Sequence, residues 1–335
     1  MEEKLLDIKN LSVSFATDRG TVYAVNGIDI ELYSGETLGI IGETGAGKTT
    51  TALAIMHLLD TSIARVSSDN FIFRGKEMEQ MDEDSLRDLR GREISMIFQD
   101  PMSALNPTIN IVQQVSEIFR FHQNMNKADA EEAALKTLEM VRIPRNRAYE
   151  FPHQFSGGMK QRVVIAIALA CSPKIIISDE PTSALDVTIQ AQVLRLIKDL
   201  QKSINTSMIM ITHDFGIVAE TCDKVAVMYA GEIIESGSIR DIFKNPLHPY
   251  TIGLFNAVPS LTKKVDYLYQ IDGLMPDPMI LHKGCPFAER CKYAKPECKS
   301  QKPMATAIPG ESHSVKCHLY SGVIEHVDVK GWEKT

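Results

Sequence analysis

Residues 42–49 are Gly-Glu-Thr-Gly-Ala-Gly-Lys-Thr, and this octapeptide constrains the fold more than any other part of the chain. It follows the apolar run 37–41, which is typical of a buried parallel strand, and it precedes the helix-forming segment 51–59. Glycines in such a strand–loop–helix unit let backbone N–H groups turn toward phosphate oxygens, and the helix N-terminus adds partial positive charge. The unit therefore predicts a phosphate-binding loop in an α/β fold.

Two side chains of this loop have expected roles. Lys48 would place its ammonium on the outer phosphates, and the Thr49 hydroxyl would ligate Mg²⁺. The other residues expected to hold the nucleotide there, mainly through backbone N–H groups, are Gly42, Gly45, Ala46, Gly47 and Thr50.

Composition limits the other possibilities. The 335 residues suggest two or three compact units, and 44% hydrophobic with 24% charged residues is typical of a soluble globular protein. A net charge of −7 does not favour nucleic acid as a partner. No signal peptide is recognisable and no apolar run approaches the roughly 20 residues that span a bilayer. We therefore expect a cytoplasmic chain that would serve a membrane only through partner subunits.

The remaining pattern predicts an order of elements. Residues 4–40 alternate like a small antiparallel sheet, and from about 108 to 170 the pattern is helical. A parallel core sheet is expected from strands at 94–98, 174–178 and 207–211, with a helix near 187–202 and a closing hairpin at 225–237. After about 238, Pro, Lys, His and Cys become frequent, which indicates a separate appendage.

Polar residues at expected strand ends carry the chemistry. Asp179 and Glu180 follow a buried strand, at the end where parallel sheets bind ligands. Asp179 would hold Mg²⁺ through water and Glu180 would act as general base on the attacking water. Gln99 follows the strand 94–98 and can reach both Mg²⁺ and that water. His213 follows the strand 207–211 and could bind the γ-phosphate and orient Glu180.

A second phosphate site is expected at a helix start. Ser156 would cap a helix, and Gly157 and Gly158 permit the close approach of another group. Because one nucleotide does not need two such sites from one chain, this one is expected to serve an ATP held by a second subunit. Residues 183–186, ending in Asp186, follow the paired carboxylates.

Six motifs in this order resemble the nucleotide-binding subunit of ATP-binding-cassette (ABC) transporters over residues 4–237. In that family residues 42–49 are Walker A, Gln99 the Q-loop and 155–159 the signature. Asp179 and Glu180 are Walker B with its catalytic Glu, 183–186 the D-loop and His213 the switch. The usual signature is Leu-Ser-Gly-Gly-Gln, whereas this chain has Phe-Ser-Gly-Gly-Met and keeps the Ser and both Gly.

The resemblance implies a fold and a set of partners. The fold is a P-loop, RecA-like core with an antiparallel β subdomain, an inserted α-helical subdomain at about 100–170, and a C-terminal extension from 238 to 335. Two ATPase subunits would close head to tail over ATP and Mg²⁺, driving permease subunits in the membrane, which would bind near 99–106. The family also stacks adenine on an aromatic side chain, for which Phe15 is preferred and Tyr23 is the rival.

The tail narrows the resemblance to peptide importers. Asn245-Pro-Leu-His-Pro-Tyr-Thr251 and the cysteines at 285, 291, 298 and 317 are similar to the tails of dipeptide and oligopeptide importer ATPases. Those work with a sister ATPase and an extracytoplasmic solute-binding protein. Nickel importers share this subunit type, so nickel or another small solute is the alternative cargo. A soluble cassette ATPase of DNA repair or translation is less well supported, because neither a long coiled coil nor a second cassette is present.

The four tail cysteines suggest a metal site. Cys285, Cys291, Cys298 and Cys317 lie within 33 residues, but they lack the two-residue turns of common zinc sites. Looser loops with Pro after the first Cys suit a [4Fe–4S] cluster as well as zinc, and the resemblance favours the cluster. Zinc that staples a small tail remains the alternative.

Overall fold

The computed structural model describes residues 3–183, 185–257 and 270–324. Residue 184 of the expected 183–186 motif, and residues 258–269 and 325–335 of the expected extension, lie outside the described residues. The chain divides into two compact units, each described by itself. The first comprises Met1–Leu6, Leu32–Thr37 and Ile72–Ile211, and the second comprises Asp7–Glu31, Leu38–Phe71 and Thr212–Thr335.

A parallel sheet forms the core of the first unit. Strands β7 (Ile94–Ile97), β8 (Ile175–Asp179) and β9 (Ser207–Ile211) are buried along their whole length and lie side by side in that order. Because strands of a parallel sheet are covered on both faces, their sequences are continuous apolar runs. The predicted core strands are confirmed, and so is the predicted helix after β8, which is α7 (Val187–Ile204).

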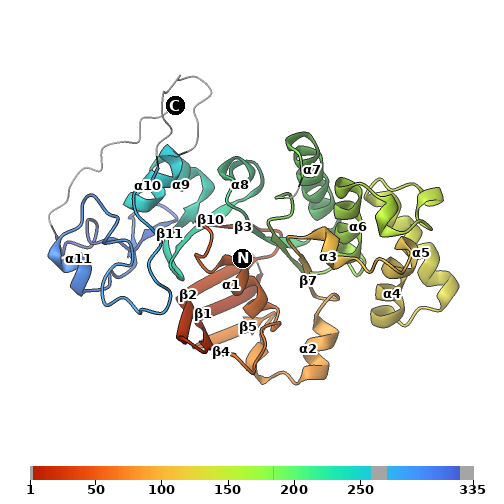
Figure 1. Ribbon diagram of the computed structural model, residues 1–335, viewed down its shortest axis with the longest axis horizontal. Coiled ribbons are helices and arrows are strands. Elements are labelled where there is room, and N and C mark those ends of the chain that lie inside the picture. The colour runs from red at the N-terminus through yellow and green to blue at the C-terminus, as the bar shows by residue number, and fades with distance from the viewer. Residues whose placement is uncertain (1–2, 184, 258–269, 325–335) are drawn as a thin grey trace. The chain divides into compact units, whose positions relative to one another are not determined.

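The predicted helical segment contains three long helices and one short one. These are α3 (Pro101–Ala104), α4 (Ile111–Gln123), α5 (Lys127–Met140) and α6 (Gly157–Leu169). Asn110 and Asn126 cap α4 and α5 by accepting hydrogen bonds from backbone N–H groups of the first turn. Figure 1 shows α4, α5 and α6 packed together, which buries the apolar stripe of each helix.

Two short segments of this unit were not predicted. One is the hairpin of β5 (Asn70–Phe73) with β6 (Lys76–Glu77), and the other is α2 (Glu83–Leu89). Strand β6 and helix α2 are short and highly charged, and β5 has only four residues, so none of them shows a clear apolar period.

The second unit contains an antiparallel sheet and, in a different sheet, the strand that leads into the phosphate loop. Strand β1 (Lys4–Thr17) lies beside β2 (Gly20–Tyr33) and pairs antiparallel with β4 (Ala64–Ser67), which confirms the predicted sheet. Strand β3 (Thr37–Ile41) leads through the loop to α1 (Lys48–Ile55). It pairs in parallel with β10 (Lys224–Tyr229), which forms the predicted hairpin with β11 (Glu232–Ser238).

The C-terminal segment, expected as a separate appendage, adds two strands beside β11, in the sheet that contains β3 and β10. Strand β13 (His313–Val315) pairs antiparallel with β11, and β12 (Thr306–Ala307) pairs with β13. The other elements of this unit are α8 (Phe215–Thr221), α9 (Ile239–Lys244), α10 (Pro249–Asn256) and α11 (Pro296–Ser300). No described helix of the chain has the length and apolar character needed to cross a membrane.

The buried carboxylate of Glu235 ties three segments of the second unit together. It accepts hydrogen bonds from the backbone N–H groups of Leu247 (2.7 Å) and His248 (2.8 Å), and it lies 2.8 Å from Nε2 of His313. The side chains of Glu235 and His313 are both fully buried. Burial alone lowers the pKa of His313, but the hydrogen bond and charge of Glu235 outweigh it and hold this pKa above its ordinary value.

We expect the loss of stability in His313→Gln to depend on pH. A raised pKa means that the folded protein binds the proton more tightly than the unfolded chain. This contribution to the free energy of unfolding is therefore fully present below about pH 6.5, the unfolded pKa, and is lost as pH rises through the raised value. The urea midpoint should fall more in the variant at pH 6 than at pH 9.

Exposed His153 supplies the matched control. The His153→Gln variant should leave the urea midpoint within error of wild type at both pH values. An equal loss at pH 6 and pH 9 in His313→Gln would show that the imidazole acts only through packing.

Candidate functional site

The phosphate loop is shaped by close backbone approaches. Gly42, Gly45 and Gly47 have φ angles of 157°, 84° and 102°, a region that favours glycine. A Cβ on Gly42 would lie 2.1 Å from the carbonyl oxygen of Met228, and one on Gly47 would lie 2.4 Å from that of Ala24. Only glycine can therefore hold the loop against these two carbonyls.

The lysine of the loop is held at its mouth. Nζ of Lys48 donates to the carbonyl oxygens of Gly42 (2.8 Å) and Glu43 (3.0 Å), and only 6% of the residue is exposed. Thr49 is exposed, Thr50 is half-buried and Ala46 is fully buried. Because Gly47 is the N-cap residue of α1, the first N–H groups of this helix open onto the loop.

The structure brings Gln99 and Glu180 together. Strands β7 and β8 are parallel neighbours, so the residues that follow them meet at one sheet edge. There Nε2 of Gln99 donates to Oε2 of Glu180 over 3.0 Å. Glu180 has a φ of 44°, unusual for a residue with a side chain, and its N–H donates to the carbonyl of Ile211 (2.9 Å). Strain of this kind is found where a side chain must be aimed at a site.

Asp179 lies at the last position of β8, directly before Glu180. Only 2% of the residue is exposed, and its register partner in β9 is Ile211. A buried carboxylate is costly unless it serves a cation or a donor, which suits a residue expected to act on Mg²⁺.

The signature segment packs against the segment that follows the paired carboxylates. Ser156 is the exposed N-cap residue of α6, and its side chain makes no capping hydrogen bond, contrary to the predicted cap. A Cβ on Gly158 would lie 2.5 Å from Cγ2 of Ile189, and one on Gly157 would lie 3.6 Å from Leu185. Asp186 caps α7 by accepting from the N–H of Ile189 (3.1 Å).

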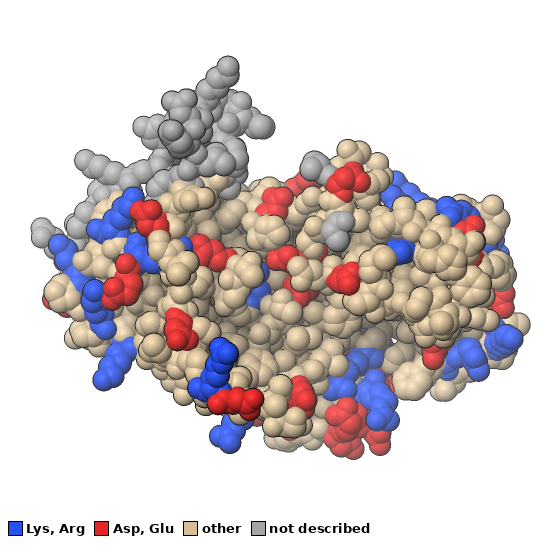
Figure 2. All heavy atoms as spheres, viewed as in Figure 1, with Lys and Arg blue, Asp and Glu red and all other residues tan. Residues whose placement is uncertain are grey.

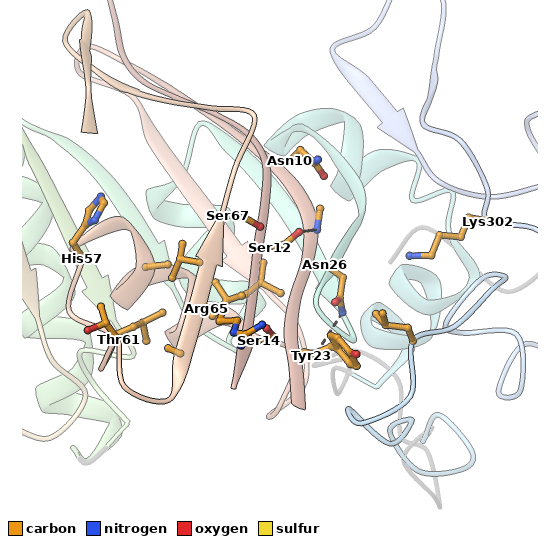
Figure 3. A pocket seen from close by; sticks show the side chains of 18 residues that line it. Asn10, Ser12, Ser14, Tyr23, Asn26, His57, Thr61, Arg65, Ser67 and Lys302 are labelled. Carbon is orange, nitrogen blue, oxygen red and sulfur yellow. Dashed lines mark hydrogen bonds between the residues drawn. The ribbon is translucent and has the colours of Figure 1, made fainter. Parts of the chain in front are cut away.

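The other predicted residues of the nucleotide site belong to the second unit. His213 is exposed just after β9. Phe15 is half-buried in β1, opposite Ala64 of β4. Its rival Tyr23 lines a cavity of about 990 Å³ and lies beside Asn26 in Figure 3. These positions do not decide between Phe15 and Tyr23, so the stacking of adenine on Phe15 stays a prediction.

The four cysteines line one small apolar cavity, together with His248 and Phe287 among others. Burial, with a smaller effect of neighbouring cysteines, raises the pKa of Cys285 and Cys317 to about 12 and also raises that of Cys291. The predicted metal is not supported by this arrangement. Within the described ranges no group of three or more His, Cys, Asp or Glu residues is placed to hold a metal ion. The cavity holds about 20 Å³, close to the volume of one water molecule.

One contact of the phosphate loop could not be predicted from the sequence. Arg290, from the segment between two of the cysteines, forms an ion pair with Glu43 inside the loop. The two residues are separated by 247 positions and no local pattern joins them. On the face shown in Figure 2, acidic and basic side chains are mixed.

Comparisons with known proteins agree with this geometry. The ABC transporter family profile matches residues 25–183, and the profile of the oligopeptide/dipeptide transporter C-terminal region matches 234–298. The chain is 47% identical to the dipeptide transport ATP-binding protein DppD of Bacillus subtilis, over 98% of both chains. It is 48% identical to the oligopeptide transport ATP-binding protein OppD of Escherichia coli, over 92% of this chain and 91% of that one.

Solved structures extend the agreement to the fold. The dimeric ATP-binding cassette MJ0796, in a post-hydrolysis state bound to ADP and Pi, matches with a TM-score of 0.61 and 27% identity, covering 70% of this chain and 99% of that one. Fold and site thus define an ATPase with the cassette architecture. The chain belongs to the ABC transporter family, in its oligopeptide/dipeptide transporter group, as an ATP-binding subunit.

Two glycines of the loop should respond differently to alanine. Gly42→Ala adds a clash with Met228 to an unfavourable φ, so we expect it to lower the free energy of unfolding by about 3 kcal/mol or more. Gly45→Ala meets no atom within 4 Å and should cost only the backbone strain of about 1–2 kcal/mol. Urea unfolding measures both, and an equal cost would contradict the close approach.

Proposed function

We propose that this chain hydrolyses ATP to drive the import of dipeptides and oligopeptides through a membrane permease. The observation that carries the proposal is the Gln99–Glu180 hydrogen bond at the carboxyl ends of two parallel strands, in a chain with a complete phosphate loop. Its cassette region is residues 1–237 and its extension is residues 238–335.

The residues of the nucleotide site divide by task. Gly42, Gly45, Ala46, Gly47, Lys48, Thr49 and Thr50 hold the phosphates, while Thr49, Gln99 and Asp179 hold Mg²⁺ directly or through water. Glu180 is the general base, His213 binds the γ-phosphate and Gln99 positions the attacking water. The adenine stacks on Phe15.

A second ATPase subunit completes each site. Ser156, Gly157, Gly158 and Asp186 face the nucleotide held by that subunit, which accounts for a Ser hydroxyl that does not cap its own helix. The similar cassette MJ0796 is dimeric in its solved structures. The partner of this chain is a sister ATPase rather than a second copy, because the similarity lies in a group whose importers use two kinds of ATPase.

The helical lobe offers a surface for the permease. Phe98, Met102 and Tyr149 are large apolar side chains with exposed fractions of 42%, 60% and 51%. We place the chain on the cytoplasmic face of the membrane, where permease subunits cover this surface. The cargo is delivered to them by an extracytoplasmic solute-binding protein.

Peptides are favoured over nickel as the cargo. DppD and OppD are named for dipeptide and oligopeptide transport, and the matching C-terminal profile has the same description. A soluble cassette ATPase is disfavoured by this similarity, which extends through the tail.

Glu180→Gln should abolish ATP hydrolysis while ATP binding is retained. The amide keeps the size of the side chain and its contact with Gln99 but cannot accept the proton of the attacking water. We expect kcat to fall at least about 100-fold, the usual contribution of general-base catalysis, with unchanged affinity for Mg·ATP. Phosphate release and equilibrium binding measure the two quantities.

Exposed Glu79, on the short 3-10 helix Met78–Gln80, gives the control Glu79→Gln, which should hydrolyse ATP like wild type. Wild-type turnover in Glu180→Gln would reject the role of Glu180. In cells that co-express the permease and sister subunits, labelled dipeptide uptake should disappear with Glu180→Gln. Glu180-dependent nickel uptake without peptide uptake would replace the proposed cargo.

We also propose that the four cysteines hold a [4Fe–4S] cluster, with zinc as the alternative. Two observations support a thiolate-bound centre although the described cavity is narrow. Four thiols line the same space, and Nε2 of buried His248 has no hydrogen-bond partner among the described residues. Nδ1 of this ring accepts from the N–H of Tyr250 (3.1 Å), so the neutral ring carries its proton on Nε2, a donor suited to a thiolate.

Metal analysis decides this proposal. Anaerobically purified protein should contain about four irons per chain and absorb broadly near roughly 400 nm, as thiolate-bound clusters do. Cys298→Ser should lose both, whereas Cys171→Ser, outside the cavity, should keep them. One zinc in a colourless protein would establish the alternative, and a metal-free folded protein would reject both.

A further inference from the structure

The C-terminal segment contacts the phosphate loop through an ion pair and hydrogen bonds to one loop residue, Glu43. The guanidinium of Arg290 donates from Nη1 to Oε2 of Glu43 (2.8 Å) and from Nη2 to Oε1 (3.1 Å). This two-bond geometry fixes the carboxylate in position as well as neutralising it. Glu43 is the second residue of the loop, and its carbonyl oxygen is one of the two that hold Nζ of Lys48.

Arg290 is itself rigidly held. Only 7% of its side chain is exposed, and the guanidinium lies over the rings of Tyr229 and Phe287, at 5.7 and 5.8 Å from their centres. Its Nε donates to the carbonyl of Asp272 (2.9 Å) and Nη2 also donates to that of Ile271 (3.3 Å). Because these contacts immobilise the guanidinium, it also fixes the position of the carboxylate that it binds.

A second group of the tail holds the backbone of the same residue. The hydroxyl of Tyr250 accepts a hydrogen bond from the N–H of Glu43 (2.9 Å). Tyr250 is fully buried and packs against Tyr229, with ring centres 4.6 Å apart. The side chain and the amide of Glu43 are therefore both fixed by residues that lie outside the loop.

The negative charge of Glu43 is the physical reason for its ion pair with Arg290. A carboxylate in a loop that binds a triphosphate repels the ligand unless a cation neutralises it. Arg290 supplies that charge from the side chain, which leaves the ammonium of Lys48 for phosphate. Loss of Arg290 would expose the loop to an uncompensated negative charge.

We propose that Arg290 and Tyr250 are positioning residues of the nucleotide site, through which the C-terminal segment sets the affinity of the phosphate loop for ATP. This inference rests on the proposed binding of ATP at residues 42–49. Arg290 directly precedes Cys291, and the segment Cys285–Cys291 begins and ends at residues that line the cysteine cavity. The loop therefore responds to the folding of the tail.

A double-mutant cycle with ATP affinity as the readout tests the proposal. The variants are Arg290→Gln, Glu43→Gln and the double variant, each in the full chain. Lys299→Gln is the matched control, because Lys299 forms an exposed ion pair with Glu289 (3.0 Å) in the same tail. Binding of Mg·ATP, KM and kcat are measured for each, with circular dichroism to establish folding.

We expect Arg290→Gln to weaken Mg·ATP binding about tenfold, as loss of one charge-assisted pair does, and to raise KM more than it lowers kcat. Glu43→Gln removes the repelling charge but keeps only one acceptor for Arg290, so it should weaken binding by a smaller factor than Arg290→Gln. The double variant should recover part of the affinity lost in Arg290→Gln, because the repelling charge is gone. Lys299→Gln should change nothing. Tyr250→Phe should weaken binding by a smaller factor, with Arg290 intact.

Wild-type affinity in Arg290→Gln, or a double variant as weak as Arg290→Gln, would overturn the proposal. If Arg290→Gln does not fold, Arg290→Lys replaces it in the cycle, since it keeps the charge but loses the two-bond geometry. An intermediate loss of about threefold is then expected, and no loss would overturn the proposal. Lys48→Ala distinguishes a failure of the proposed ATP site from a failure of the role proposed for Arg290. Unchanged ATP binding in Lys48→Ala would reject the nucleotide site itself, whatever the result for Arg290→Gln.

Discussion

The close approach of the phosphate loop to two backbone carbonyls is the constraint on which the functional architecture depends. Gly42 and Gly47 lie so near the carbonyl oxygens of Met228 and Ala24 that no side chain fits. These carbonyls belong to β10 and β2, so the loop takes its curvature from strands that close the second unit around it. The hairpin of β10 and β11 is in turn extended by β13, so the support of the loop reaches into the C-terminal segment. A phosphate site of this kind is a property of the whole unit rather than of eight residues.

A different constraint shapes the first unit. Three parallel strands there are fully buried, so their polar neighbours can only gather beyond the carboxyl ends. The contact of Gln99 with Glu180 follows directly from the register of β7 with β8. The positive φ of Glu180 marks backbone strain at the residue that accepts the hydrogen bond from Gln99. The same turn begins the segment that leads to Asp186, the cap of α7.

The sequence was informative where a local pattern has one physical cause. Short continuous apolar runs predicted β3 and the parallel strands, and helical spacing predicted α5, because burial imposes these periods. The meeting of Gln99 and Glu180 could be predicted since neighbouring parallel strands end together. The ion pair of Arg290 with Glu43 could not, because each residue alone resembles an ordinary surface charge. Nor could the pairing of β13 with β11, since a strand of three residues has no period to recognise. The chemistry and spacing of the four cysteines predicted that they share a site. They did not predict the small volume of the cavity that the cysteines line.

The buried polar contacts of the tail show what this segment contributes physically. Glu235 binds two backbone N–H groups and His313, so it fixes the start of α10 against β11 and β13. That helix carries Tyr250, whose hydroxyl meets the loop amide of Glu43. Buried carboxylates and guanidinium groups contribute little net stability, since desolvation offsets most of their attraction, but a broken pair is costly. Their value here is geometric. One continuous set of hydrogen bonds runs from β13, through Glu235 and α10, to Glu43 of the phosphate loop. Arg290 reaches Glu43 from the cysteine segment. A segment held only by apolar packing would stabilise the fold equally well, but it would not fix the position of a single loop residue.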